Sequence, residues 1–173
     1  MVKKGLLFSI FLLILFFPVI VCGQNSNETL SPIKIGEKTL CDNLSIKIIE
    51  SPTFTTSTLG LKAENTFLVV KVEIAYKLEE DWNGIDQDSF KLINTSNGKN
   101  QIYSLNYAAT MMSGISQGFD GLNQKLSFPD RPRYLLFFDA INKRNNWILY
   151  FAPHERGKGE AICESIIPLP KIY

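Results

Sequence analysis

The sequence has few of the residues from which enzyme and metal sites are commonly built. Its 173 residues include one histidine, His154, and three cysteines. One histidine and separated cysteines do not supply the ligand spacing of a zinc site. Glycine-rich loops of the kind that hold phosphate groups are also absent from the sequence. We therefore expect no cofactor, and the sequence favours a protein that is not an enzyme.

A charge excess of either sign is missing as well. Lysine and arginine number 18, and aspartate and glutamate number 17. Two of the lysines, Lys3 and Lys4, lie at the start of the chain, so the remainder has a net charge of about −1. A protein that binds nucleic acid usually carries a basic patch or stripe, which this composition does not provide. The sequence therefore predicts no nucleic-acid partner.

The longest apolar run lies at the N-terminus, directly after those two lysines. It extends from Leu6 to Val21 and is followed by Cys22 and Gly23. A positive start, an apolar run and a cleavage site, in this order, are typical of a signal peptide. The sequence therefore predicts a signal peptide over residues 1–23 and a flexible, polar lead-in over residues 24–32.

Two other fates of this segment stay open. The run is near the lower length limit for a membrane span, so an uncleaved segment would anchor the chain. Alternatively, Cys22 becomes the acylated residue of a lipoprotein and tethers the domain to a membrane face. In each case we expect the rest of the chain outside the cytoplasm, either secreted or associated with the cell envelope. Contact with a membrane is then expected through an uncleaved signal or a lipid anchor alone.

Two cysteines follow the leader, Cys41 and Cys163, near opposite ends of the remaining chain. Disulfides form and persist in oxidising compartments outside the cytoplasm. We therefore expect a disulfide between these two residues, and the alternative is a pair of free, buried thiols.

The stretch Thr66–Leu78 carries the clearest signal for secondary structure. Alternate residues from Leu68 to Tyr76 are apolar, whereas Lys71, Glu73 and Lys77 occupy positions of the opposite face. Such alternation is typical of a β-strand with one buried face. A strand with one solvent-exposed face needs an antiparallel sheet and a second layer that buries the other face.

Several shorter stretches are expected to be strands too. They are Ile33–Gly36, Leu40–Glu50, Phe90–Ile93, Gln101–Leu105, Tyr134–Ala140, Trp147–Ala152 and Ala161–Ile167. Thr53–Asn65 is expected to be a loop or a long hairpin connection, and Asn97-Gly98 is a strong hairpin-turn signal. About seven or eight strands without a long helix predict an all-β fold, an antiparallel β-sandwich, in one domain over residues 33–173.

The chain resembles one known family in the pattern of these strands. The likeness is carried by Phe67–Ile74 (FLVVKVEI), Asp88–Leu92 (DSFKL), Asn97-Gly98-Lys99 with Tyr103, Pro129 before Tyr134–Asp139 (YLLFFD), and Trp147–Leu149. It is similar to the telokin-like domain of unknown function 4352, an exported immunoglobulin-type sandwich family of bacteria and archaea. The resemblance covers about Ile33–Ile167. It implies an immunoglobulin-like sandwich on an exported protein and no catalytic motif.

One segment stands out as a candidate binding surface. It is otherwise rich in glycine, serine and alanine but carries Tyr107, Met111, Met112, Ile115 and Phe119. Adaptable, methionine-rich surfaces are used for binding. The alternative is that this segment, with a helical turn at Tyr107–Met112, folds back and covers one end of the sandwich.

The acidic stretch after the long strand is the candidate for an ion site. Asp81, Asn83, Asp86 and Asp88 offer the oxygen ligands that Ca²⁺ prefers, but their spacing does not match an EF-hand loop. The alternative is a solvated connection between strands. Asp86 and Asp88, or Glu155, are also the carboxylates that a hydrolase of the two-carboxylate type would use.

These observations together predict an exported or cell-surface sandwich that acts as a non-catalytic binding or interaction module. Its partner is expected to be a protein or a small ligand, because sandwiches gather loops at their ends. Two alternatives are a structural envelope lipoprotein tethered through Cys22 and a carboxylate-dependent hydrolase.

Overall fold

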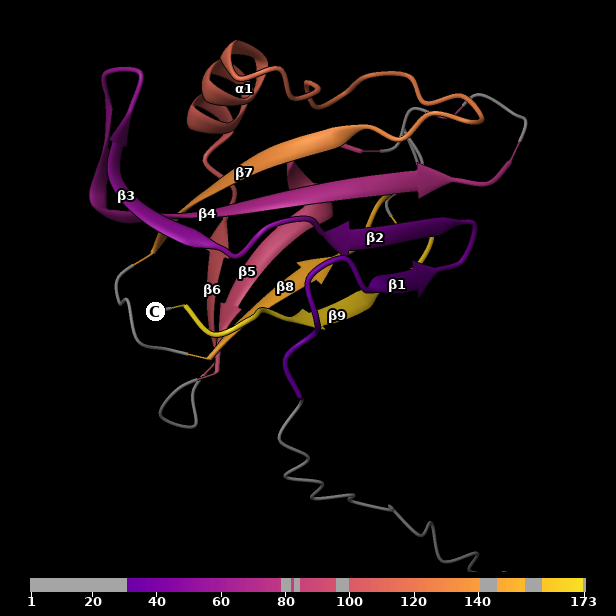
Figure 1. Ribbon diagram of the computed structural model, residues 1–173, viewed down its shortest axis with the longest axis horizontal. Coiled ribbons are helices and arrows are strands. Elements are labelled where there is room, and N and C mark those ends of the chain that lie inside the picture. The colour runs from indigo at the N-terminus through magenta and orange to yellow at the C-terminus, as the bar shows by residue number, and fades with distance from the viewer. Residues whose placement is uncertain are drawn as a thin grey trace, which may run out of the picture.

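The computed structural model describes residues 31–78, 82, 85–95, 100–140, 146–154 and 160–172. Within these residues nine strands form two antiparallel sheets that face each other (Figure 1). The first sheet contains β1 (Lys38–Cys41), β2 (Leu44–Ile48), β3 (Thr53–Thr58), β4 (Leu61–Tyr76) and β7 (Arg133–Ala140). The second has the order β6 (Gln101–Ser104), β5 (Phe90–Asn94), β8 (Trp147–Phe151) and β9 (Ser165–Pro168). The all-β sandwich predicted from the sequence is confirmed, with nine strands rather than seven or eight.

The long strand β4 organises the first sheet as the alternation predicts. β2 and β3 pair with successive stretches of one edge of β4, and β7 pairs with the other edge. The alternate apolar side chains from Leu68 to Tyr76 are buried between the sheets. On the opposite face, Lys47 of β2 and Glu73 of β4 form an ion pair of 2.7 Å. The strand begins at Leu61, five residues before the expected start.

Two predicted segments of the first sheet are wrong because tight turns divide them. The single strand expected at Leu40–Glu50 is the hairpin of β1 and β2, with Asp42-Asn43 between the paired residues Cys41 and Leu44. Asp42 adopts a positive φ of 51°, which aspartate tolerates in turns. Thr53–Asn65, expected to be a loop or a long hairpin connection, is a hairpin formed by β3 and the start of β4, so the loop is wrong. β-Branched threonine suits a pleated sheet.

The first and last strands of the domain also differ from those predicted. Ile33–Gly36 is not a strand, although the Ile33 N–H donates to the Pro168 carbonyl over 3.0 Å. Gly36 turns the chain at φ 82° before β1. The last strand, β9, starts at Ser165, so Cys163 precedes it instead of lying within it. Nonetheless, β5 pairs with β6 as expected, although the predicted turn at Asn97-Gly98 lies outside the described residues.

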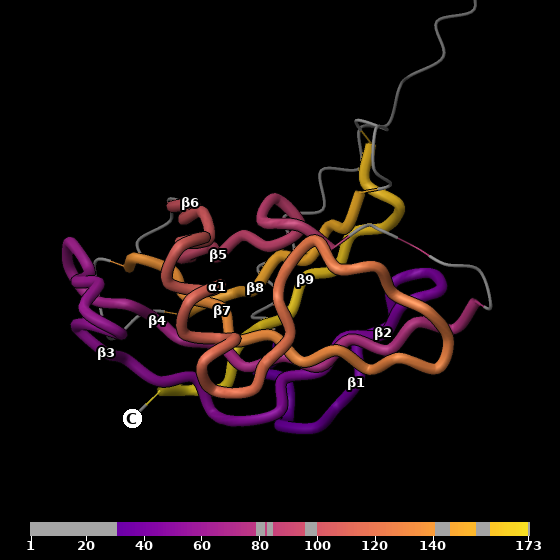
Figure 2. Tube along the Cα trace, turned by 90° about the horizontal axis from the view of Figure 1, so that it is seen from above, coloured from indigo at the N-terminus to yellow at the C-terminus, as the bar shows by residue number. Residues whose placement is uncertain are grey.

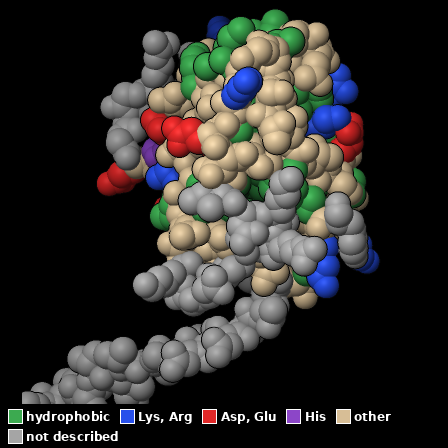
Figure 3. Space-filling model, turned by 90° about the vertical axis from the view of Figure 1, so that its left-hand side faces the viewer, with side chains coloured by type: hydrophobic (Ala, Val, Ile, Leu, Met, Phe, Trp, Pro, Cys, Tyr) green, Lys and Arg blue, Asp and Glu red, His purple; other side chains and the backbone are tan. Residues whose placement is uncertain are grey.

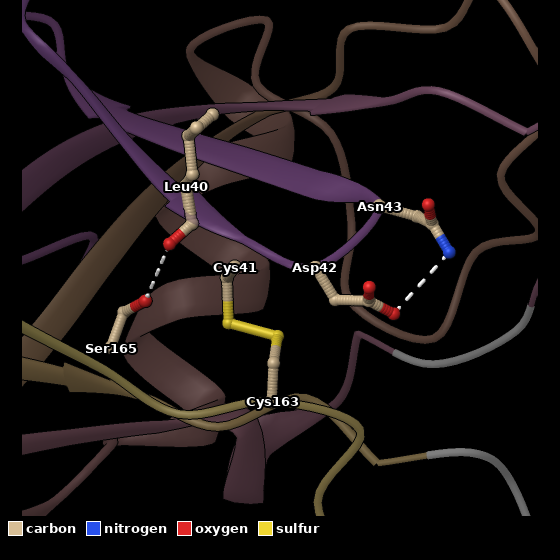
Figure 4. Close-up of a disulfide and its surroundings, with 6 residues drawn as sticks. All are labelled: Leu40, Cys41, Asp42, Asn43, Cys163 and Ser165. Atoms are coloured by element: carbon tan, nitrogen blue, oxygen red, sulfur yellow. Dashed lines mark hydrogen bonds between the residues drawn. A yellow bond between two sulfur atoms is a disulfide. The ribbon is translucent and has the colours of Figure 1, made fainter.

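A disulfide between Cys41 and Cys163 closes one side of the sandwich, and this expected pairing is confirmed. It joins the end of β1 to the segment before β9, with the two Cα atoms 5.5 Å apart (Figure 4). Beside it, the Ser165 hydroxyl donates to the Leu40 carbonyl over 3.1 Å. On the opposite side, a bridge between Leu105 and Phe138 joins the second sheet to β7. The two sheets are thus connected along both sides.

The helix α1 (Tyr107–Ser116) lies outside the sandwich, on the outer face of the first sheet (Figures 1 and 2). Beneath it a second, smaller core contains Phe67, Val69, Ala109, Leu135 and Phe137, separate from the main core between the sheets. The expected cover over one end of the sandwich is therefore wrong, because the segment covers a sheet face. No helix among the described residues is long and apolar enough to cross a membrane.

Candidate functional site

The helix α1 buries small residues against the sheet and exposes three of its four large side chains. Ala109, Thr110, Ser113 and Gly114 are buried against the sheet. A surface helix normally turns its large apolar side chains toward the core and its polar ones outward. Here three large apolar side chains, Tyr107, Met112 and Ile115, lie on the outer side, whereas Met111 packs against the main core. The helix sequence, YAATMMSGIS, contains no charged residue.

Three large side chains of α1 face solvent: Tyr107 is 41% exposed, Met112 51% and Ile115 58%. We call these three residues the α1 ridge. Hydrophobic side chains gather at the top of the side view, at the level of α1 (Figure 3). Scattered apolar side chains on a surface are ordinary, whereas several on one uncharged helix face form a patch of the kind used in binding.

Side-chain hydrogen bonds hold α1 in this orientation. Asn106 caps the helix by accepting from the Ala109 N–H over 3.0 Å. The buried Thr110 hydroxyl accepts the N–H of Phe137 in β7 over 3.1 Å. At the tip of the β3–β4 hairpin, the hydroxyls of Thr58 and Ser113 lie 2.7 Å apart. The ridge is therefore presented on a fixed support.

The other two residues of the predicted binding surface have structural positions. Met111 packs against the main core, and its sulfur accepts the Leu122 N–H over 3.2 Å. Phe119 packs on the smaller core, with Lys71 Nζ and Arg133 Cζ each 5.8 Å from its ring centroid. The structure thus exposes Tyr107, Met112 and Ile115 on α1, whereas Met111 and Phe119 are partly buried.

A second candidate lies on the second sheet, outside the sandwich. It is a cavity of about 380 Å³, which we call the polar hollow. Its charged and polar lining consists of Asp88, Lys91, Tyr150, His154, Glu160 and Glu164. On one flank of Figure 3, acidic, basic and histidine side chains stand close together. The volume falls in the range of small-molecule sites, about 300–1,000 Å³.

Cross-strand pairing forms the floor of the hollow. Lys91 of β5 and Tyr150 of β8 are directly opposite in the register. Burial, and next the hydrogen bonding and charge of the Glu164 carboxylate, raise the pKa of Tyr150. These residues are far apart in the sequence and belong to no motif. The register, which the sequence does not specify, brings them together.

The two described calcium candidates have separate positions. Asp86 caps the short 3-10 helix Gln87–Ser89, accepting from the N–H groups of Asp88 and Ser89 over 3.0 and 2.9 Å. Asp88 lines the polar hollow instead. Asp81, Asn83 and the hydrolase candidate Glu155 lie outside the described residues, as does Cys22. Among the described residues, no group of three or more His, Cys, Asp or Glu side chains is placed to hold a metal ion.

A serine motif found in many hydrolases is present in the sequence. Gly114–Gly118, GISQG, has the Gly-x-Ser-x-Gly spacing of a nucleophile elbow. An elbow places its serine at a sharp strand-to-helix turn. Ser116 instead ends α1, where its hydroxyl donates to the Ser113 carbonyl over 3.0 Å. His154 lies in the polar hollow on the other sheet, so this motif does not have the setting of an elbow.

Comparisons with known proteins support the fold and identify no family. No family model matches the chain, and no curated protein matches it in sequence. A solved structure of a candidate lipoprotein, ycdA, from Bacillus subtilis matches with a TM-score of 0.55 and 14% identity, over 78% of this chain. The match spans 38% of that protein's length. An uncharacterised β-sandwich protein of Clostridium difficile 630 matches with a TM-score of 0.49 and 16% identity, over 81% of this chain and 94% of that one. At this identity the likeness to the Bacillus protein shows the β-sandwich fold alone.

Proposed function

We propose that the chain is a non-catalytic binding module that acts outside the cytoplasm and engages a protein partner through the α1 ridge. The observation that carries the proposal is the orientation of α1. Its small residues pack on the sheet, and Tyr107, Met112 and Ile115 remain in water. Exposing large apolar side chains costs free energy, about 1.5–3 kcal/mol for each that a partner would bury fully.

The chemistry of the ridge favours a protein with an apolar groove. An apolar, uncharged helix face is the form that binds by laying its side chains into such a groove. Aromatic and methionine side chains are enriched at the centres of interfaces, and charged ones are depleted there. A charged partner would find no opposite charge on α1, because α1 carries no charged residue.

The proposed location rests on the leader-like segment and the disulfide. The Cys41–Cys163 bond is of the kind that persists in oxidising compartments. In Figure 1 the described chain begins at the bottom, and α1 lies at the top. If residues before Ser31 tether the chain to a membrane, as an uncleaved anchor or through a lipid on Cys22, the α1 ridge lies at the end of the domain remote from the tether. Membership in the telokin-like family is part of the same proposal.

Photo-crosslinking from single positions tests this function. A photoreactive amino acid replaces Met112 or Ile115 in the whole chain, expressed in its own host. A matched variant carries it at Ile102, which is 63% exposed on the second sheet. We expect one discrete protein adduct from the α1 positions and none from position 102.

Competition identifies specific adducts. Added wild-type protein should abolish the adduct, whereas a Met112→Glu/Ile115→Glu variant should not. Equal adducts from all three positions, or equal competition by the variant, would contradict a binding role for α1.

A further inference from the structure

The polar hollow is independent of the α1 ridge and lies on the other sheet. Three carboxylates, those of Asp88, Glu160 and Glu164, share it with Lys91 and with the imidazole of His154. Among the described residues, neither Lys91 nor His154 forms an ion pair with a carboxylate. The cavity is therefore lined by one lysine and three carboxylates, and this lysine forms no ion pair with a carboxylate of the described residues. Negative charge is in excess.

The lining is supported from several directions. Lys91 and Tyr150 stand on neighbouring strands, and Asp88 belongs to the turn that Asp86 caps. On the opposite wall, His154 forms a bridge with Ala161, and the Ile162 N–H donates to the Pro153 carbonyl over 2.8 Å.

The disulfide anchors this same wall. Cys163 lies between Ala161 and Glu164, which both line the hollow, and it is bonded to Cys41 of β1. A lining that is already ordered loses little entropy when a ligand binds, which favours affinity.

We propose that the polar hollow binds a small zwitterion of amino-acid to dipeptide size, holding its ammonium group with the carboxylates and its carboxylate with Lys91. A ligand with cationic groups alone would face Lys91, and an anion would face three carboxylates. A zwitterion satisfies both signs. A divalent metal ion fits less well, because the described part of the chain has no group of three ligating side chains close enough for coordination.

A titration with alanyl-alanine tests the proposal. The whole chain, expressed with its leader in an exporting host and purified oxidised, is followed by two-dimensional amide NMR. We expect saturable shifts at Lys91, Tyr150 and Glu164. N-acetylation of the dipeptide should weaken binding at least about tenfold, which corresponds to about 1.4 kcal/mol. Amidation of its carboxyl group should also weaken binding.

Substitutions in the hollow complete the test. Glu164→Gln and Lys91→Met keep the size of the side chain and remove one charge, and both should weaken binding. Met112→Glu on α1 should leave dipeptide binding unchanged. Failure of the zwitterion proposal can therefore be distinguished from failure of the proposal that the α1 ridge binds a protein. The proposal is overturned if no saturable shifts occur at millimolar dipeptide, or if the N-acetylated dipeptide binds equally well.

Discussion

Thr110 joins the helix to the sheet beneath it. Its side chain is 4% exposed, and its hydroxyl accepts the Phe137 N–H over 3.1 Å. That N–H belongs to an edge of β7 that α1 covers, so no water is available to replace the acceptor. A buried donor without an acceptor costs about 1–3 kcal/mol.

We therefore expect Thr110→Val, which keeps the shape but removes the hydroxyl, to lower the free energy of unfolding by about 1–3 kcal/mol. Urea denaturation of the oxidised protein measures the change. Thr110→Ser retains the hydroxyl and is the matched control. A Val variant as stable as the Ser variant would show that the bond does not support α1.

Tyr134 is the second residue whose position has a measurable consequence. It is fully buried, and its hydroxyl has no hydrogen-bond partner among the described residues. Burial, and to a lesser degree the carboxylate of Asp120, raises the pKa of Tyr134 from its ordinary value of 10.0. The unfolded chain therefore loses this proton at a lower pH than the folded chain does.

The sign of the pH effect follows from this difference. Stability is unaffected by Tyr134 below pH 10 and falls above it, by up to about 1.4 kcal/mol per pH unit. We expect Tyr134→Phe to be less sensitive to alkali than wild type in urea denaturation between pH 8 and 11. At pH 7 it should be at least as stable, since no hydrogen bond is lost. A parallel pH dependence of the two proteins would contradict the argument.

At the scale of elements, sequence periodicity predicts features that lie within a single strand, such as which of its faces is buried. The alternation from Leu68 to Tyr76 specifies both faces of β4, and the long apolar run of β7 marks burial on both sides. The turns after Cys41 and Thr58 were missed because each takes two residues. The orientation of α1 was missed because its buried residues are small and give no apolar period.

The β3–β4 hairpin contains an unusual turn residue. Leu59 and Gly60 connect the paired residues Thr58 and Leu61, with φ of 43° and 81°. Two positive φ values are typical of a type I′ turn, in which Asn-Gly is preferred. Leucine in a left-handed conformation is disfavoured by roughly 1–2 kcal/mol.

Leu59→Asn should accordingly stabilise the protein, by about 0.5–1 kcal/mol, since asparagine tolerates this conformation. Thermal unfolding monitored by circular dichroism measures it. In the control, Gly60→Ala should destabilise the protein, because Gly60 has positive φ although space for a Cβ is open. If Asn lowers the melting temperature, the packing of Leu59 outweighs its backbone conformation.

At the scale of the whole molecule, the disulfide connects the beginning of the sandwich to its end. Cys41 and Cys163 are 122 residues apart in the sequence. The chain-entropy account assigns about 4–5 kcal/mol to closing a loop of this length. The expected export to an oxidising compartment was sufficient to predict this disulfide. The polar hollow beside it depends on strand register, which the sequence does not specify, and was not predictable.

Cys41→Ser/Cys163→Ser should therefore lose about 4–5 kcal/mol of stability. It should also bind alanyl-alanine more weakly, because the wall with Glu164 loses its anchor. Reduction of the wild-type protein should reproduce both effects, and reduction of the double variant should do nothing further. An unchanged unfolding midpoint after reduction would contradict the closing role of the bond.

The central claim is that the α1 ridge, rather than another exposed apolar group, binds the partner. The most direct measurement is the affinity of the crosslinked partner, once purified, for three forms of the whole chain by calorimetry. These are wild type, Met112→Glu/Ile115→Glu, and Ile102→Glu as the exposed isoleucine on the second sheet. The ridge substitutions lie on the surface and should change stability by no more than about 0.5 kcal/mol.

The account predicts that the double variant loses at least about a hundredfold in affinity, or about 2.8 kcal/mol, while Ile102→Glu binds like wild type. Equal affinity for wild type and the double variant would show that α1 is not the binding surface.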